Sequence, residues 1–157
     1  MNIEHLARVA DLNARYADAI DADRLEAWPD FFLDDGRYRI TTAENLAQGL
    51  PLSMVYATSR AMLRDRITAL REANVYEGQY YRHVLGTPLI AAVETDGLRA
   101  RTSFMVARVM RSGETVLFAT GYYEDRIVFD APDGARFAEK TVILDSRQID
   151  TLLAIPL

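Results

Sequence analysis

The spacing of apolar residues along this chain changes from a helical period to a strand period. Apolar side chains recur at intervals of three and four residues over residues 3–21, which predicts an amphipathic helix. Asp23 and Glu26 have the spacing of a capping box, and they predict a second, shorter helix directly afterwards. The first thirty or so residues are therefore expected to be mostly helical.

Short elements follow. Asp34-Asp35-Gly36 predicts a turn, and the alternation after it predicts a strand in which Tyr38 and Ile40 face inward. Residues 43–53 are expected to be irregular because Gly49 and Pro51 interrupt them, and residues 54–58 to form a short strand.

A third helix is expected to begin after Ser59, a residue type that favours the N-cap position. Its apolar residues have helical spacing, so the helix should run to about Asn74 with one side turned inward. The residues expected on that inward side are Met62, Leu63, Ile67 and Leu70.

Strand patterns dominate the second half of the chain. Asp96-Gly97 is a strong hairpin signal, and Ser112-Gly113 and Pro132-Asp133-Gly134 mark two further turns. Residues 150–157 are apolar enough to dock or pair. The strands expected between these turns cover residues 82–85, 89–94, 98–110, 115–129 and 136–144.

Helices followed by hairpin-linked strands indicate an α+β fold with one curved, mostly antiparallel sheet whose concave face is covered by the N-terminal helices. This pattern is typical of the cone-shaped fold shared by nuclear transport factor 2, ketosteroid isomerase and scytalone dehydratase, which is also described as cystatin-like. No repeat, linker or low-complexity tract divides the chain, so residues 1–157 are expected to form a single domain.

Composition narrows the functional classes. The net charge of −5 disfavours nucleic acid and anionic membranes as partners. The chain has no cysteine and only two histidines, His5 and His83, which excludes disulfides, thiolate catalysis, Cys/His zinc sites and a Rieske cluster. No apolar run is long enough to span a membrane and the N-terminus lacks a signal-peptide pattern, so a cytoplasmic protein is expected.

Acid/base chemistry is the first catalytic possibility, because some cone-shaped proteins hold carboxylates and a tyrosine in an apolar pocket. Such a chain would be a dehydratase or isomerase that works without a cofactor, and a ligand-binding protein of the same fold is a further alternative. The candidate residues below could equally be structural, because a tyrosine or histidine in a sheet is often part of the core or of its rim. The candidates are Tyr38, Tyr56, His83, Asp125 and Glu139.

Metal binding has less support. An iron site with two histidines and one carboxylate would need His5 and His83 to converge with an acid, and no short spacing places two ligands on one element. The pairs Asp21/Asp23 and Asp34/Asp35 lack the pattern of a calcium loop and are explained by caps and turns. No metal site is expected on this chain.

A subunit interface is the second functional possibility. Segment 76–83 is rich in tyrosine and arginine, and protein interfaces favour both residue types. The third predicted helix also carries arginines on its polar side. A solvated helix face or a core position explains each of these residues equally well. The interface candidates are Arg60, Arg64, Arg71, Tyr80, Tyr81 and Arg82.

Several short motifs resemble the small (β) subunits of aromatic-ring-hydroxylating dioxygenases over nearly the whole chain. Within that family the motifs are most similar to those of terephthalate 1,2-dioxygenase small subunits. The small subunits of anthranilate dioxygenase and salicylate hydroxylase are nearly as similar. The motifs are Trp28-Pro29-Asp30-Phe31-Phe32, Tyr38-Arg39-Ile40-Thr41, 62–67, 70–74, Tyr76-Glu77, Tyr81-Arg82-His83 with Leu85-Gly86, Phe104-Met105-Val106 with Arg108, Gly113-Glu114-Thr115 with Gly121 and Tyr123, and 150–152 with Pro156-Leu157.

The resemblance implies a structural subunit of a terminal oxygenase that acts on an aromatic carboxylate. In this family the large α subunit carries the Rieske [2Fe–2S] cluster and the mononuclear non-haem iron, and the small subunit carries no catalytic, metal or cofactor-binding residue. The family assembles as α3β3, with the β subunits forming a trimer, and a separate reductase supplies electrons. The expected partners are therefore the α subunit, other β subunits and, indirectly, the reductase.

Overall fold

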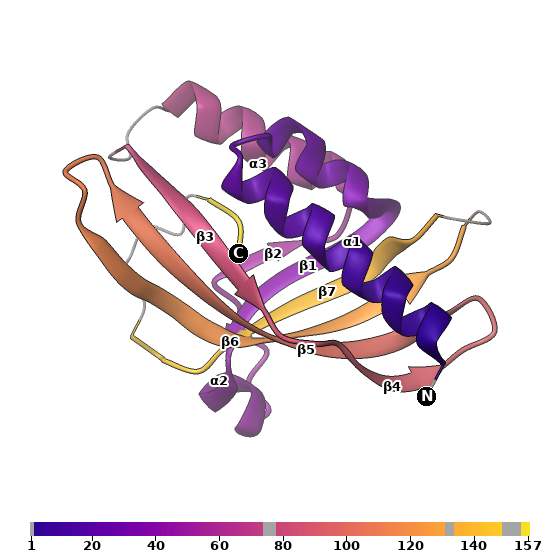
Figure 1. Ribbon diagram of the computed structural model, residues 1–157. Coiled ribbons are helices and arrows are strands. Elements are labelled where there is room, and N and C mark those ends of the chain that lie inside the picture. The colour runs from indigo at the N-terminus through magenta and orange to yellow at the C-terminus, as the bar shows by residue number, and fades with distance from the viewer. Residues whose placement is uncertain (1, 74–77, 131–133, 149–154) are drawn as a thin grey trace.

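Helices lie on one face of a curved sheet in the computed structural model, which describes residues 2–73, 78–130, 134–148 and 155–157 (Figure 1). The helical elements are α1 (Ile3–Asp21), the 3₁₀ helix η1 (Leu25–Phe31), α2 (Ala43–Ala47) and α3 (Arg60–Ala73). The strands are β1 (Phe32–Thr42), β2 (Val55–Ala57), β3 (Gln79–Leu85), β4 (Leu89–Val93), β5 (Gly97–Met110), β6 (Thr115–Val128) and β7 (Arg136–Leu144).

The strand order is β2-β1-β7-β6-β5-β3, and β4 also pairs with β5. β1 and β7 run parallel, whereas every other pair among the described strands is antiparallel. β1 and β7 can be parallel neighbours because the long stretch of chain between Thr42 and Arg136 brings β7 back beside β1. The expected α+β fold with a mostly antiparallel sheet is confirmed.

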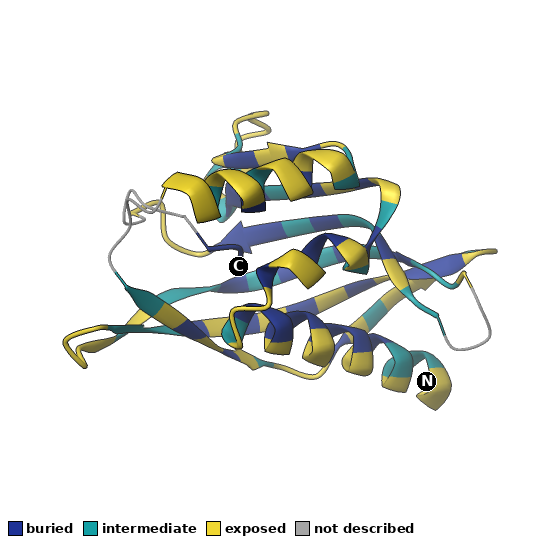
Figure 2. Ribbon diagram, turned by 90° about the horizontal axis from the view of Figure 1, so that it is seen from above, coloured by how far each residue is buried: buried dark blue, intermediate teal, exposed yellow. Residues whose placement is uncertain are grey.

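The helix predicted over residues 3–21 is confirmed at both ends. Asn2 caps it, since its side-chain oxygen accepts hydrogen bonds from the backbone N–H groups of Glu4 and His5. Its inner side is buried while its outer side is exposed to solvent (Figure 2). Val9, Leu12, Tyr16 and Ile20 form that inner side and pack against the concave face of the sheet.

The predicted capping box at Asp23 and Glu26 is wrong. Asp23 has a positive φ of 57°, which belongs to a tight turn and not to an N-cap, and no side chain caps η1 at Arg24. Instead, both carboxylates bind the guanidinium of Arg71 on α3, at 3.0 and 2.7 Å. The two acids therefore connect the chain between α1 and η1 to a distant helix.

The turn predicted at Asp34-Asp35-Gly36 is also wrong, because these residues lie inside β1. The pairing of β1 with β7 is interrupted between Phe32 and Arg37, so the segment forms an irregularity in the strand. Residues 43–53 were expected to be irregular, but they begin with α2, whose residue Asn45 donates its backbone N–H to the side chain of Thr42.

The remaining predicted helix and strands agree with the structure within a few residues, whereas residues 132 and 133 of one predicted turn and residues 150–154 lie outside the described residues. Ser59 caps α3 by accepting the backbone N–H of Met62, and Leu63 and Ile67 are buried as expected. Met62 is the exception, because its side chain is 44% exposed. It lies beside Thr58, whose N–H and hydroxyl both contact its sulfur.

Close strand packing restricts one residue on the inner face of the sheet. A Cβ atom at Gly121 would lie 2.0 Å from the main-chain oxygen of Ile143 on the neighbouring strand β7. Only glycine allows the two strands to approach so closely at this point. Among the described residues, no helix is long and apolar enough to cross a membrane.

Candidate functional site

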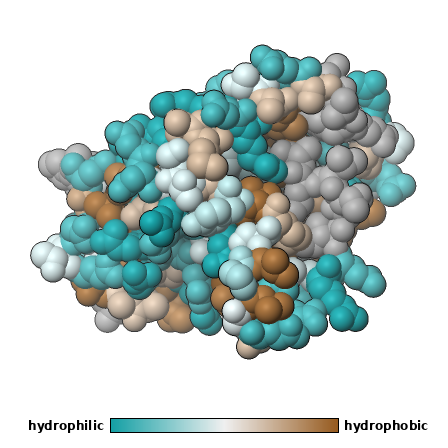
Figure 3. All heavy atoms as spheres, turned by 180° about the vertical axis from the view of Figure 1, so that it is seen from behind, coloured by the Kyte–Doolittle hydropathy of each residue, from teal (hydrophilic) through white to brown (hydrophobic). Residues whose placement is uncertain are grey.

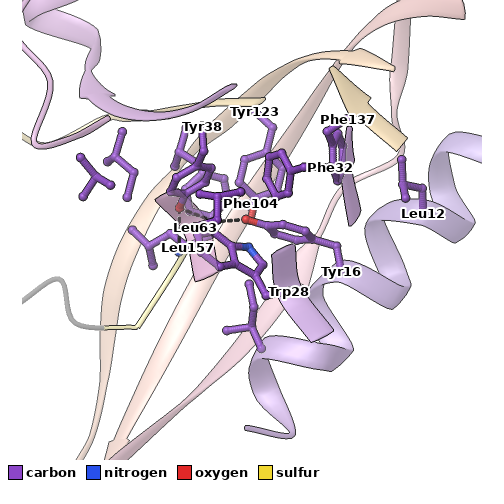
Figure 4. Packing of buried hydrophobic residues seen from close by; sticks show 14 of the residues in the cluster. Leu12, Tyr16, Trp28, Phe32, Tyr38, Leu63, Phe104, Tyr123, Phe137 and Leu157 are labelled. Carbon is purple, nitrogen blue, oxygen red and sulfur yellow. Dashed lines mark hydrogen bonds between the residues drawn. The ribbon is translucent and has the colours of Figure 1, made fainter. Parts of the chain in front are cut away.

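The space between the sheet and the helices, here called the cone interior, is lined by aromatic side chains. Trp28 comes from η1, Tyr16 from α1, and Tyr38, Tyr123 and Phe137 from the sheet (Figure 4). Trp28 meets Tyr38 edge to face, with ring centroids 5.0 Å apart. These five side chains are 0% exposed, so no water-sized space touches them.

Residue Leu157, at the C-terminal end of the described chain, occupies the middle of this aromatic cluster. Its main-chain oxygen accepts hydrogen bonds from the hydroxyls of Tyr16 at 2.7 Å and Tyr38 at 3.0 Å (Figure 4). Its N–H donates to the Tyr38 hydroxyl at 3.2 Å. Leu157 is itself 0% exposed, and the cone interior is therefore filled at this point by the chain's own residues.

A buried ion pair joins two neighbouring strands, β6 and β7, on the inner side of the sheet. Lys140 Nζ is 3.2 and 3.1 Å from the two carboxylate oxygens of Asp125, and both side chains are 0% exposed. The ammonium also lies over the rings of Tyr123, Phe137 and Tyr16, at 3.6, 4.2 and 4.6 Å from their centroids. One carboxylate and three aromatic faces thus surround this cation.

Burial shifts the ionisation of these interior groups. It raises the pKa of Asp125 to about 6 in spite of the opposing charge of Lys140, and it lowers the pKa of Lys140. Burial also raises the pKa of the phenols of Tyr16 and Tyr38, which keeps both hydroxyls protonated as hydrogen-bond donors. Burial therefore works against the charged form of both Asp125 and Lys140, and it keeps the two tyrosines neutral.

A second buried pair joins α1 to β3. Asp21 Oδ1 lies 2.6 Å from Nδ1 of His83, and Asp21 Oδ2 accepts the backbone N–H of His83 at 2.8 Å. The side chains are 0% exposed for His83 and 6% for Asp21. Both oxygens of the carboxylate are therefore used to hold the end of α1 against the sheet.

The five acid/base candidates do not converge on one point. Tyr38 and Asp125 lie in the cone interior, where Leu157 and Lys140 are their partners. His83 faces inward but is bound to Asp21. Tyr56 is 55% exposed, and Glu139 lies on the opposite face of the sheet, 3.9 Å from Arg99.

Tyr16 belongs to the apolar side predicted for the helix over residues 3–21, whereas the sequence analysis did not single out Lys140, Asp21 or Leu157 as interior residues. A single lysine in an alternating strand, against seventeen arginines elsewhere, was the available signal for Lys140. The two histidines do not meet: His5 stacks on Phe129 with ring centroids 5.6 Å apart. In the described part of the chain no three His, Cys, Asp or Glu side chains are grouped to hold a metal.

The arginines proposed for an interface on α3 already have partners within the chain. Arg60 donates to the main-chain oxygen of Phe32 and pairs with Asp34 at 2.9 Å, with its side chain 15% exposed. Arg64 pairs with Asp30 at 3.3 Å, on η1. These contacts and those of Arg71 join α3 to η1 and to the start of β1.

The other three interface candidates lie on β3, where alternation separates them. Tyr81 faces the interior and is 1% exposed, whereas Tyr80 is 54% exposed and Arg82 is exposed on the opposite side of the strand. The part of the tyrosine-rich segment at residues 76–77 lies outside the described residues.

Tyr80 and Arg82 belong to an apolar region on the outer face of the sheet, here called the outer patch. In the strand register Val84 pairs with Met105, and Arg82 pairs with Ala107, which in turn pairs with Leu117. Val84, Met105 and Leu117 are 54%, 47% and 64% exposed. Figure 3 shows that hydrophobic residues also gather in groups between hydrophilic ones on the rear of the molecule.

The fold and the filled interior define a class of cone-shaped domains. Residues 1–141 match the family model described as a SnoaL-like domain. The chain is 47% identical to the terminal oxygenase component subunit beta 1 of terephthalate 1,2-dioxygenase from Comamonas sp, over 96% of this chain and 97% of that protein. It is 39% identical to the anthranilate 1,2-dioxygenase small subunit from Burkholderia cepacia, over 93% of this chain and 90% of that protein.

Structural comparison agrees with these similarities. A crystal structure assigned as the β subunit of an aromatic-ring-hydroxylating dioxygenase from Novosphingobium aromaticivorans superposes with a TM-score of 0.89 and 38% identity, covering 97% of this chain and 96% of that one. The chain belongs to the family of small (β) subunits of aromatic-ring-hydroxylating dioxygenases.

Proposed function

We propose that this chain is a non-catalytic structural subunit of a terminal oxygenase that dihydroxylates an aromatic carboxylate such as terephthalate. The substrate class is suggested by the terephthalate dioxygenase subunit that shares 47% of its residues with this chain. The whole chain, residues 1–157, would act as one domain in the cytoplasm. Its contribution would be buried area and shape, while the chemistry takes place on the large α subunit.

The filled cone interior is the observation that carries this proposal. An acid/base enzyme of this fold needs a cavity in which a substrate meets a carboxylate or histidine. Here Leu157 takes that place against Tyr16 and Tyr38, and Asp125 is bound to Lys140. The charged side chains of the interior are therefore bound to one another or to the main chain, and they are not directed at a substrate cavity.

The iron groups of the oxygenase would lie on the α subunit, as a Rieske [2Fe–2S] cluster and a mononuclear non-haem iron. A Rieske centre needs two cysteines and two histidines, and this chain has no cysteine. Its two histidines are engaged in different places, with Phe129 and with Asp21. These residues do not fit either iron group.

We further propose an α3β3 assembly in which the outer patch contacts a neighbouring subunit. Exposed apolar side chains next to an exposed tyrosine and arginine are typical of interface anchors. Tyr80 and Arg82 are the strongest of the six interface candidates because they face outward. Tyr81, Arg60, Arg64 and Arg71 would support the interface indirectly, through the fold of this subunit. The reductase would meet the assembly through the α subunit.

Co-expression with the large oxygenase subunit tests this function. Light scattering should give the mass of three copies of each chain, and iron should be present only in samples that contain the large subunit. Arg82→Ala and Tyr80→Ala should shift the mass toward smaller species, whereas the exposed control Arg15→Ala should not. A chain that stays apart from the large subunit would contradict the proposal.

A further inference from the structure

The hydrogen bonds to Leu157 define a possible binding site. It would hold one oxygen atom of a ligand and pack against the apolar part of the same ligand. Two phenol hydroxyls, from Tyr16 on α1 and Tyr38 on β1, converge on a single oxygen atom at 2.7 and 3.0 Å. Tyr38 also accepts the N–H of the same residue. Both tyrosines are wholly buried, so these donors are directed into the interior and not toward water.

The two phenol donors at this oxygen suit a negatively charged acceptor. Burial raises the pKa of Tyr38, and the hydrogen bond with Leu157 and the charge of Arg66 act in the opposite direction. Protonated phenols and a nearby guanidinium are the groups that stabilise a carboxylate in a desolvated site. Asp125, an acid of the same interior, is bound to Lys140 at 3.1 Å, so its charge is compensated within the chain.

The walls of the site are apolar and aromatic. Trp28, Phe32, Leu63 and Phe104 surround Leu157 together with the two tyrosines (Figure 4). The hydroxyl of Tyr123 is buried and has no hydrogen-bond partner among the described residues, whereas the Trp28 side chain acts as a hydrogen-bond partner of Tyr16 and opposes the effect of burial on the pKa of that phenol. A buried hydroxyl of this kind leaves a donor that a bound ligand could use.

We propose that the cone interior is a binding site for a small apolar carboxylate, and that Ile155–Leu157 occupy it as an intramolecular ligand. The ligand would place one carboxylate oxygen between Tyr16 and Tyr38 and a branched aliphatic body where the Leu157 side chain lies. The site is closed in the intact chain because the tethered segment is present at high effective concentration. This inference starts from the same placement of Leu157 as the proposed structural function but goes beyond it, and ligand binding is measured separately from assembly with the large subunit.

The site can be opened by two changes to the chain. One variant lacks residues 155–157, and a full-length second variant carries Leu157→Asp, in which burial of a charged side chain drives the segment out. The probe is N-acetyl-L-leucine, which reproduces the N–H, the oxygen and the side chain of Leu157. N-acetyl-L-aspartate is the matched control because it keeps the N–H and the carboxylate but has a polar body.

Trp28 provides the readout because it is the single tryptophan and lies in the site. We expect N-acetyl-L-leucine to change its fluorescence in a saturable way in both opened variants, with binding at least about tenfold tighter than in the intact chain. Adding Tyr38→Phe should weaken that binding about tenfold, since a hydrogen bond to a charged group is lost. The exposed substitution Tyr56→Phe should leave it unchanged.

Three results would overturn the proposal. The first is a folded opened variant, judged by circular dichroism, that does not bind N-acetyl-L-leucine. The second is equal binding of N-acetyl-L-aspartate, which would mean that the apolar walls do not select the ligand. The third is binding that Tyr16→Phe and Tyr38→Phe leave untouched. If the shortened chain does not fold, the full-length Leu157→Asp variant decides the question in the same assay.

Discussion

Lys140 Nζ and the carboxylate of Asp125 form an ion pair at 3.1 Å in which neither side chain has any exposed surface. The pair joins neighbouring strands, since Asp125 of β6 and Lys140 of β7 are direct partners in the sheet register. Three aromatic rings complete the surroundings of the ammonium. In this family member the interior charges therefore compensate one another within the fold.

Removing one member of this pair should be far more costly than removing both. Lys140→Met leaves Asp125 buried without its cation, so the free energy of unfolding should fall by about 3–5 kcal/mol. The double variant Lys140→Met with Asp125→Leu should lose clearly less than the two single variants together. Urea unfolding of all four chains measures this cycle, and simple additivity of the two losses would contradict it.

The same pair predicts a dependence of stability on pH. Burial raises the pKa of Asp125 in the folded chain from 3.8 to about 6, so the folded state holds this proton more tightly than the unfolded state does. The stabilisation by Asp125 is thus fully present below the unfolded pKa and is lost as the pH rises through the folded pKa. Relative to Asp125→Asn, the natural chain should lose on the order of 2–3 kcal/mol between about pH 4 and 7.

Unfolding of both chains at several pH values within that window checks the sign. The exposed substitution Asp65→Asn serves as the control, because a surface carboxylate contributes little. A natural chain that gains stability over Asp125→Asn as the pH rises would show that the pair favours its charged form.

Local signals in the sequence predicted most of the elements, whereas long-range contacts decided the features that were missed. The spacing over residues 3–21 and the N-cap at Ser59 act within a few residues, and both are confirmed. Asp23 and Glu26 have the spacing of a cap, yet their partner is Arg71, forty-eight and forty-five residues away. Only the tertiary fold brings that guanidinium to them.

The candidate site follows the same rule. Alternation along β7 predicts a strand, but the placement of Lys140 on its inner face depends on Asp125 of the neighbouring strand. The apolar character of residues 150–157 indicated that they could dock, without indicating where. Hydrogen bonds from Tyr16 and Tyr38, more than a hundred residues earlier, determine the position of Leu157.

The pair of Asp21 and His83 should stabilise the junction of α1 with the sheet. Asp21→Ala leaves the buried backbone N–H and Nδ1 of His83 without their acceptor, and the free energy of unfolding should fall by about 1–3 kcal/mol. Asp18→Ala is the matched control, since Asp18 is 66% exposed and pairs with Arg24 at the surface. Chemical denaturation compares the two, and equal losses would mean that the buried pair has no special role.

Arginines on α3 and on β3 should differ in what they stabilise. Arg60→Ala removes donors to Phe32 and a pair with Asp34, so the isolated chain should lose about 1–3 kcal/mol of stability. Arg82→Ala, on the outer patch, should change the stability of the isolated chain by less than about 0.5 kcal/mol but should weaken assembly. Urea unfolding of the two isolated variants checks this difference. An Arg60→Ala chain as stable as the natural chain, together with a destabilised Arg82→Ala chain, would contradict the prediction.

Product formed per iron in the assembled oxygenase tests the central claim most directly. Complexes of the large subunit with the natural chain, Asp21→Asn and Asp125→Asn would be separated by size, and their iron and turnover measured. If this chain is structural, the amount of complex will vary while turnover per iron stays the same. An interior substitution that lowers turnover per iron, with assembly and iron content unchanged, would show that this subunit takes part in the chemistry.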